Sequence, residues 1–492
     1  MRNRIRLDAY DHLVNFNPPL FYRKQFRYAG ESGGAPMDEN LALMDEDEVH
    51  ADRVAAILEA VEARDAVRLT ALMEPLHAAD IADVLEQIGG AARAGLLALW
   101  SGEIDGEILS EIDESIREEV IEALPDSVVA EAMRELDTDD VVDILEDLDA
   151  EEQGKILGAL EDADRVAVQQ ALSYPEDSAG RLMQREVVVA PEHWTVGEAI
   201  DFLRGADNLP DQFYHVILTD PRMKPVGYVT LGRVLSAGRD VALRAIVEDS
   251  FRTVAATDPE GDVAYMFNQY HLISCPVVDA GGRLVGVITI DDAMNVLDEE
   301  HEEDMLRLAG VGDESSISDG VWDTVKARLP WLAISLVTAN IGALVISQFE
   351  GTIAAVVVLA ALMPIVAAMG GNAATQSLTV AVRALATRDL TGANAWRVVR
   401  RELAVGVVNG VAFAAVMGLA AWGLFGAPLI GAVIGLALIV TLIVAALAGV
   451  VVPLVLDRMG FDPALSSGTF VITLTDVIGF FAFLGLATVI LL

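Results

Sequence analysis

The chain of 492 residues contains a single cysteine, Cys275. One thiol cannot form an intramolecular disulfide, which excludes a disulfide-stapled fold and predicts a reducing compartment for the soluble part. Cys275 stands in the apolar run LISCPVV. This setting favours a buried, unreactive thiol over a nucleophile.

Cations are scarce, since 33 Lys and Arg face 75 Asp and Glu, for a net charge of −42. A nucleic-acid surface needs clustered cations, so the sequence predicts no nucleic-acid partner. The acidic surplus suits attraction of cations, and simple solubility is the ordinary alternative. It is concentrated in residues 41–165.

Catalytic motifs are missing as well. The sequence has no P-loop, no Rossmann fingerprint, no H-E-x-x-H and no G-x-S-x-G elbow. Its seven histidines are scattered, with none paired at metal-ligand spacing. We therefore expect no enzyme.

The first 35 residues are basic and polar, without the apolar core of a cleavable signal peptide. We interpret residues 1–38 as a disordered basic extension.

Long apolar runs fill the C-terminal third of the chain. A run of ~20 apolar residues is needed to cross the hydrocarbon core as a helix. Five runs qualify, at 329–348, 353–377, 402–424, 428–452 and 467–491. The sequence predicts an all-α transmembrane domain of five helices over 329–492.

The positions of Lys and Arg predict the orientation of these spans. Lys326 and Arg328 precede the first span, whereas the turns near Glu350 and in LFGAPLIG carry no cation. The loop between the second and third spans carries five arginines, Arg383, Arg388, Arg397, Arg400 and Arg401. We expect cytoplasmic N-terminal domains and an external C-terminus.

One acid, Asp476, lies near the middle of the last span. A carboxylate at the bilayer centre costs ~2.5–3.5 kcal/mol and usually marks an ion path. The alternative is a protonated carboxyl hydrogen-bonded to a neighbouring helix. Polar or small residues at similar depth, which also suit simple helix packing, complete the predicted pore site: Asn340, Asn409, Gly371 and Asn372.

These groups predict a cation pathway, because no Lys or Arg lies near the midplane. Carboxylate and amide oxygens suit a hard cation, and Mg²⁺ binds through few carboxylates while keeping its waters. One aspartate from each of two subunits on a two-fold axis would match a divalent charge. The sequence therefore predicts a homodimer in a lipid membrane.

The acidic part before the spans repeats short amphipathic helices opened by Asp or Pro, such as LPDSVVAEAMREL. We expect an all-α, superhelical domain over 39–173. Asp139 and Asp143 share one helical face. Like charges at this spacing repel, and they are either solvated or await a cation.

Residues 174–297 alternate strand and helix patterns, and G-h-h-T (h apolar) recurs at 227–230 and 286–289. This resembles a tandem pair of CBS motifs, an α/β regulatory domain. In the nucleotide-binding form an aspartate follows the threonine by three residues, as Asp292 follows Thr289. Arg233 takes that place after Thr230, which puts the first site in doubt.

A connecting segment, 298–328, joins this domain to the membrane. Its first part is expected to be a helix bearing Glu303 and Asp304. The second part has apolar residues at helical spacing and predicts a separate amphipathic helix along the membrane surface; they are Ile317, Val321, Trp322 and Val325.

The order of these modules resembles the MgtE family of magnesium channels, over about residue 40 to the end. The motifs YPEDSAGRLM, MPIVAAMGGNAATQS and DPALSSGTFVITLTDVIGFFAFLGLA carry the resemblance. It implies a homodimeric, multi-pass protein of the cell inner membrane. It also implies that Mg²⁺ is the transported ion, bound at Asp476, and that intracellular Mg²⁺ closes the pore.

The resemblance further implies regulatory metal ligands on the connecting ("plug") helix, at Glu303 and Asp304, with Asp462 as a partner of Asp304. Asp139 and Asp143 could share ions with Asp292, and ATP at Thr289 and Asp292 is left open.

Three rival interpretations remain at this point. A proton-coupled divalent cation transporter would use Asp476 as a proton-exchanging group. A CBS-regulated, membrane-anchored enzyme lacks a catalytic motif. A membrane-anchored sensor would have no need of Asp476.

Overall fold

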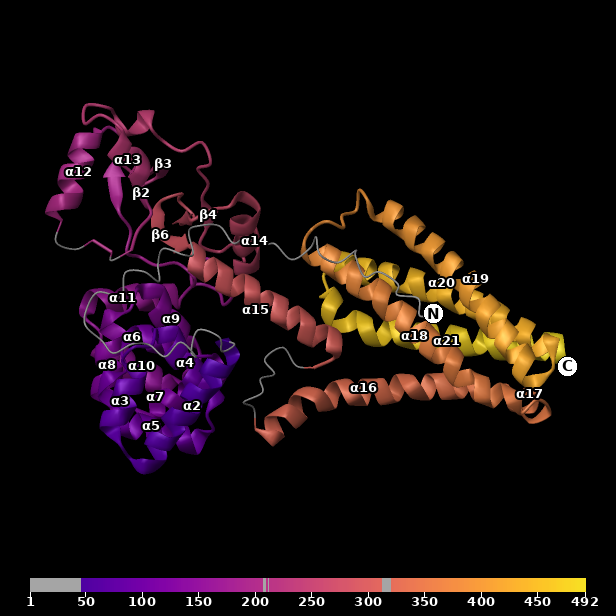
Figure 1. Cartoon of the computed structure of the whole chain (residues 1–492). Coiled ribbons are helices and arrows are strands. Elements are labelled where there is room, and N and C mark those ends of the chain that lie inside the picture. The colour runs from indigo at the N-terminus through magenta and orange to yellow at the C-terminus, as the bar shows by residue number, and fades with distance from the viewer. Residues whose placement is uncertain (1–45, 207–208, 211, 312–319) are drawn as a thin grey trace, which may run out of the picture. The chain divides into compact units, whose positions relative to one another are not determined.

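The structure is a computed structural model that describes residues 46–206, 209–210, 212–311 and 320–492. Residues 46–51, 323 and 465–467 are described by their backbone alone. The predicted basic extension and Ile317 lie outside the described residues. The chain forms two compact units, one of Met1–Leu76 with Ile88–Trp100 and one of His77–Gln87 with Ser101–Leu492 (Figure 1).

The described part of the first unit is helical. Its elements are α2 (Glu46–Ala63), α3 (Ala66–Met73) and α5 (Gly90–Trp100). Ile57, Leu69 and Leu96, one from each helix, are completely buried. Each helix therefore buries apolar side chains on one side, as the periodicity predicts, and the acidic residues of these three helices belong to α2.

The second unit opens with further short helices. They are α4 (Ala78–Gln87), η2 (Ser101–Glu103), α6 (Gly106–Ser110), α7 (Glu114–Ala123), α8 (Asp126–Glu135), α9 (Thr138–Glu146), α10 (Ala150–Ala159) and α11 (Asp162–Ala171). Asp105, Asp113 and Asp149 cap α6, α7 and α10 by accepting hydrogen bonds from backbone N–H groups. Such caps stabilise a helix by ~0.5–2 kcal/mol, which gives part of the acidic surplus a structural role.

Two equivalent three-stranded sheets follow. Strand β1 (Val189–Pro191) is parallel to β2 (His215–Thr219), which is antiparallel to β3 (Pro225–Thr230). Strands β4 (Val254–Ala255), β5 (Ser274–Val278) and β6 (Leu284–Thr289) repeat this order. The accompanying helices are α12 (Val196–Gly205), α13 (Leu231–Ser236), η3 (Leu243–Ala245), α14 (Glu260–Tyr270) and α15 (Ile290–Ala309). The predicted duplication is confirmed.

The glycine of each G-h-h-T motif has a steric reason. A Cβ on Gly227 would lie 2.6 Å from a methyl of Val247, and one on Gly286 would lie 2.6 Å from the carbonyl oxygen of Gln184. Glycine therefore allows other segments of the chain to approach β3 and β6 closely.

Five helices of the described chain are long and apolar enough to cross a membrane, which confirms the predicted number. They are α16 (Val321–Ser347), α18 (Val358–Ala386), α19 (Ala395–Phe425), α20 (Pro428–Met459) and α21 (Pro463–Leu491), with the short α17 (Glu350–Ala355) after the first. Helix α20 packs against α18, α19 and α21, whereas α16 packs against α21.

Several predicted boundaries differ from the structure. The second span begins at Val358, after α17, and passes through Pro364 without ending. Val321, Trp322 and Val325 belong to α16, so the expected separate surface helix is wrong over the described residues. Extending an existing helix costs less than nucleating a new one, and the apolar sequence after Val325 favours extension. The expected boundary at 297/298 falls inside α15.

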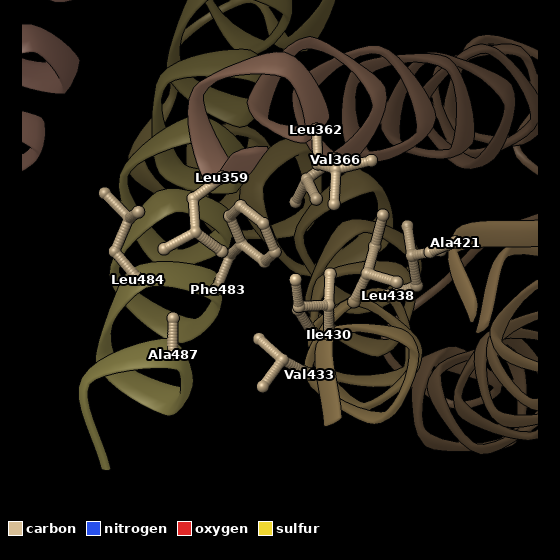
Figure 2. Close-up of a cluster of buried hydrophobic side chains, with 12 residues drawn as sticks. Leu359, Leu362, Val366, Ala421, Ile430, Val433, Leu438, Phe483, Leu484 and Ala487 are labelled. Atoms are coloured by element: carbon tan, nitrogen blue, oxygen red, sulfur yellow. The ribbon is translucent and has the colours of Figure 1, made fainter. Parts of the chain in front are cut away.

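A buried cluster holds four of these helices together (Figure 2). Phe483 of α21 is fully buried among aliphatic side chains of α18 and α20, including Val366 and Val433. Ala421 joins the cluster from α19.

Cys275 is buried on β5, and burial raises the pKa of its thiol to about 12. The prediction of an unreactive core thiol is confirmed.

We expect Gly449→Ala to destabilise the membrane domain. A Cβ at Gly449 of α20 would lie 2.7 Å from Cβ of Ser377 and 2.8 Å from the carbonyl oxygen of Ala374, both on α18. Overpacking of this kind costs ~1–3 kcal/mol. The measurement is the apparent Tm of the purified full chain in detergent. Gly423→Ala on α19 is the control, because a Cβ there meets nothing within 4 Å. Equal Tm values for the two variants would contradict the close helix contact.

Candidate functional site

Asp476 lies on α21 and is half-buried. Residues beside it are closely packed: Thr475 lies 3.8 Å from the position of a Cβ on Gly370, and a Cβ on Gly479 would lie 3.4 Å from Thr441. Among the described residues, no hydrogen bond or ion pair engages the Asp476 carboxylate. A helix-packed acid without a protein partner fits an ion ligand better than a packing group.

The other predicted pore residues are spread over three helices. Asn340 of α16 is exposed, and its side chain donates a hydrogen bond of 2.7 Å to the carbonyl oxygen of Leu336 on the same helix. Gly371 is half-buried and Asn372 exposed on α18. Within the described chain, no hydrogen bond joins them to Asp476, so their membership in one pore site stays a prediction.

Asn409 lies apart from the Asp476 helix. It lines a cavity formed by α18, α19 and α20, which also contains Glu402. Sequence reasoning missed Glu402, because the third span was expected to begin at that residue. Helix α19 begins at Ala395, which places this carboxylate inside the span. The argument applied to Asp476 would have identified it once the helix start was known.

Two predicted regulatory acids meet between α9 and α15. Asp139 is 7% exposed, and burial together with the charge of Asp292 raises its pKa well above 3.8. Burial, Asp292 and Asp137 raise the pKa of Asp140 to about 7. Burial also raises the pKa of Asp292 to about 6, although Thr289 donates it a hydrogen bond of 2.5 Å. These carboxylates repel one another unless a proton or another cation intervenes.

Asp143, the third predicted ligand there, has a protein cation as partner. Nη1 of Arg117 lies 2.9 Å from Oδ2 of Asp143 and 2.5 Å from Oδ2 of Asp147. The Arg117 side chain is only 8% exposed. Asp143 is near enough to raise the pKa of Asp292, yet its own charge is balanced within the helical domain. No sequence pattern pointed to Arg117.

A second pair of acids lies where α15 meets α21. Burial and then the charge of Asp462 raise the pKa of Asp304. Asp462 also caps α21, accepting a hydrogen bond of 2.7 Å from the backbone N–H of Ala464. Arg307, also on α15, reaches Asp462: its Nη1 is 3.2 Å from Oδ2 of Asp462, and its Nη2 is 2.9 Å from Oε2 of Glu303. Asp462 is thus near enough for its charge to act on Asp304, and the metal partnership of the two acids stays a prediction.

One of the two predicted nucleotide residues lines a narrow cavity. Thr289 lines a cavity of about 20 Å³ together with His215 and Ser274, whose side chains are hydrogen-bonded at 2.5 Å. This volume holds about one water, given a need of ~10–15 Å³ each. Asp292 is engaged with Thr289 and faces the acids of α9.

No group of three His, Cys, Asp or Glu at metal-binding distance occurs among the described residues. The arrangement offers instead two pairs of facing acids along α15 and one isolated acid in α21. Paired acids on different elements can accept a bridging hydrated cation, which would draw those elements together.

Comparison with known proteins adds the following matches. The MgtE family pattern, described as a divalent cation transporter, matches residues 363–486. The MgtE intracellular N domain matches residues 76–177, and CBS domains match 179–240 and 243–299.

Characterised relatives named magnesium transporter MgtE match most of the chain. The protein of Thermus thermophilus is 33% identical over 68% of this chain and 74% of its own length. The protein of Enterococcus faecalis is 32% identical over 65% of this chain and 71% of its own length. The protein of Bacillus subtilis is 29% identical over 68% of this chain and 74% of its own length.

Solved structures similar to the cytoplasmic part include the soluble part of a magnesium transporter, which is 24% identical. The match covers 51% of this chain and 99% of that chain, with a TM-score of 0.45. Another is the cytosolic domain of the Mg²⁺ channel MgtE in complex with ATP, which is 28% identical. The match covers 49% of this chain and 99% of that chain, with a TM-score of 0.46. Both TM-scores lie below 0.5, so the assignment depends on the sequence matches. By those matches, this chain belongs to the MgtE family of divalent cation transporters.

Proposed function

We propose that this protein is a homodimeric Mg²⁺ channel of the cell inner membrane, with its C-terminus outside, that closes when intracellular Mg²⁺ is plentiful. The observation that carries the proposal is the pair Asp304 and Asp462. One acid lies on α15, the helix that leaves the CBS domain, and the other caps α21. Asp476 follows on α21, ~21 Å further along at helical rise. A cation at the pair would therefore act directly on the helix that carries the proposed ion ligand.

Electrostatics supplies the switching force. The raised pKa values of Asp139, Asp292 and Asp304 mean that bringing these acids together is unfavourable while they are charged. A divalent cation that binds only the packed arrangement shifts the population toward it. Closure would follow from packing α9 and α21 against α15. The relatives named magnesium transporters support Mg²⁺ as the ion.

The proposed ion ligand is the half-buried, unpaired Asp476. Mg²⁺ holds its waters tightly and needs few carboxylates, so one aspartate from each subunit would suffice. The dimer supplies a second charge that one chain lacks.

ATP at Thr289 and Asp292 is a further proposal, supported by their mutual hydrogen bond and CBS-type spacing. It requires the cavity at Thr289 to widen.

We expect Asp476→Asn to abolish Mg²⁺-dependent growth rescue of a transport-deficient strain, because the amide removes the charge that attracts the ion. The control is Asp457→Asn, an exposed acid near the cytoplasmic end of α20. Membrane levels of both variants are compared by blotting. Rescue by Asp476→Asn equal to the control would refute the pore assignment. Currents recorded with and without a proton gradient separate a channel from proton-coupled transport.

For the gate, the double variant Asp304→Asn with Asp462→Asn should keep conducting at millimolar internal Mg²⁺, whereas the unmodified channel closes. Without the two charges, the ion no longer favours contact between α15 and α21. Patch recordings measure the open fraction, and Asp298→Asn, an exposed position on α15, is the control. Closure as in the unmodified protein would count against this pair.

A pH effect is expected at the α9–α15 contact. The packed state raises the pKa of Asp139 and brings those of Asp140 and Asp292 to about 7 and about 6, so it binds more protons than the separated state. Its stability is therefore present at low pH and falls as pH rises from about 4 through about 7.

Fluorophores at Glu135→Cys and Arg222→Cys, both exposed positions, should be closer at pH 5.5 than at pH 8 without Mg²⁺. Added Mg²⁺ should remove the difference. The triple variant Asp139→Asn, Asp140→Asn, Asp292→Asn should be insensitive to both. A pH dependence that persists in the triple variant would show that other groups control the contact.

A further inference from the structure

A cavity of about 180 Å³ with a mixed polar and apolar lining lies in the membrane domain, and none of its described lining residues belongs to α21. Helices α18, α19 and α20 form it, and its polar lining consists of Gln376, Ser377, Glu402 and Asn409. At ~30 Å³ of liquid volume per water, it has room for several waters. The four polar side chains of its lining give water hydrogen-bond partners there.

Among the described residues, Glu402 is the only charged one that lines the cavity. Ser377, which is 8% exposed, donates a hydrogen bond of 3.1 Å to its Oε2. Arg400 and Arg401 precede Glu402 on α19 but are exposed, and no ion pair in the described chain joins either to it. The carboxylate therefore has a hydroxyl donor but no balancing cation.

The walls of the cavity are held by a tight helix crossing. A Cβ on Gly406 of α19 would lie 3.0 Å from the carbonyl oxygen of Leu442 and 3.1 Å from Cα of Ile443, both on α20. Gly449 makes the equivalent close contact between α20 and α18. These two crossings fix the distances between the three helices, so the cavity is part of the packed bundle.

We propose that this cavity binds a hydrated divalent cation at Glu402, as a second intramembrane cation site separate from Asp476. One carboxylate, two side-chain amide oxygens and a hydroxyl form an all-oxygen ligand set, which suits a hard cation that retains waters. Lys and Arg are absent from the lining, which disfavours an anion. The inference deepens the proposed function, on which it rests only for the identity of the ion as Mg²⁺.

The competing explanation is a protonated Glu402 that serves helix packing through Ser377. The two differ in charge: a cation site holds an ionised carboxylate in contact with water, whereas a packing site holds a neutral carboxyl. Reactivity of a neighbouring thiol toward charged reagents distinguishes them without any transport measurement.

The experiment places a cysteine in the cavity by Val405→Cys, since Val405 lines it and is 41% exposed. The natural thiol is buried with a pKa of about 12 and does not compete. The purified full chain is labelled with a cationic (trimethylammonium) and an anionic (sulfonate) methanethiosulfonate, with and without millimolar Mg²⁺. Val408→Cys, on α19 but outside the lining and 67% exposed, is the control.

At Val405→Cys the cationic reagent should react about tenfold faster than the anionic one, as expected for one nearby, moderately screened charge. Mg²⁺ should slow it, and adding Glu402→Gln should remove both effects while keeping the side-chain size. Neither effect is expected at Val408→Cys. A reagent preference unaffected by Glu402→Gln, no effect of Mg²⁺, or no labelling at all would overturn the proposal.

The result is independent of the growth assay. Labelling that depends on Glu402 in a protein whose Asp476→Asn variant still rescues growth would leave this site standing and refute the proposed pore. Conversely, loss of growth rescue in Asp476→Asn without Glu402-dependent labelling would support the proposed pore and refute the site at Glu402.

Discussion

The proposed control of this protein depends on one constraint, the repulsion between carboxylates of α15 and the carboxylates that face them from neighbouring helices. The N-terminal part of α15 places Asp292 against Asp139 of the helical domain, and its C-terminal part places Asp304 against Asp462 at the start of α21. Burial, and after it the charge of the facing acid, raises the pKa of Asp139 and of Asp304, so holding these carboxylates charged in the packed arrangement is unfavourable. Under the proposed function, the protein is poised between a packed and a separated arrangement of these acids, and the concentration of the cation would decide between them.

The protein already holds some of its acids with its own cations. Arg117 neutralises Asp143 and Asp147, and Arg307 reaches from α15 to Asp462. These arginines lower the cost of packing without removing it, because Asp139 and Asp304 keep raised pKa values. If arginines neutralised all of these acids, a soluble ion would have no effect on the contact. If no arginine were present, the contact would be too unfavourable to form. Under the proposed function, the balance between these arginines and bound ions would set the ion concentration at which the packed arrangement forms.

The membrane domain depends on a different constraint, the exclusion of water from closely crossed helices. Gly406 and Gly449 allow α20 to approach α19 and α18 at backbone contact, and Phe483 fixes α21 against the same helix. Acidic groups are present in this setting at two described places, the half-buried Asp476 of α21 and Glu402 in the cavity between α18, α19 and α20.

The sequence by itself determined the order of the modules, the duplicated strand units, the five spans and the presence of an acid in the last one. The period of apolar residues, the turn residues and the length of apolar runs are local properties, so they can be recognised without knowledge of the packing. Helix boundaries were less accurate, as at α16, where extension of a helix replaced an expected break. Only the tertiary structure decided which acids meet. Asp139 and Asp292, like Asp304 and Asp462, are over 150 residues apart, and their contact depends on how whole helices pack. The same holds for Arg117, whose partners lie on another helix, and for Glu402, whose cavity exists only where three helices cross.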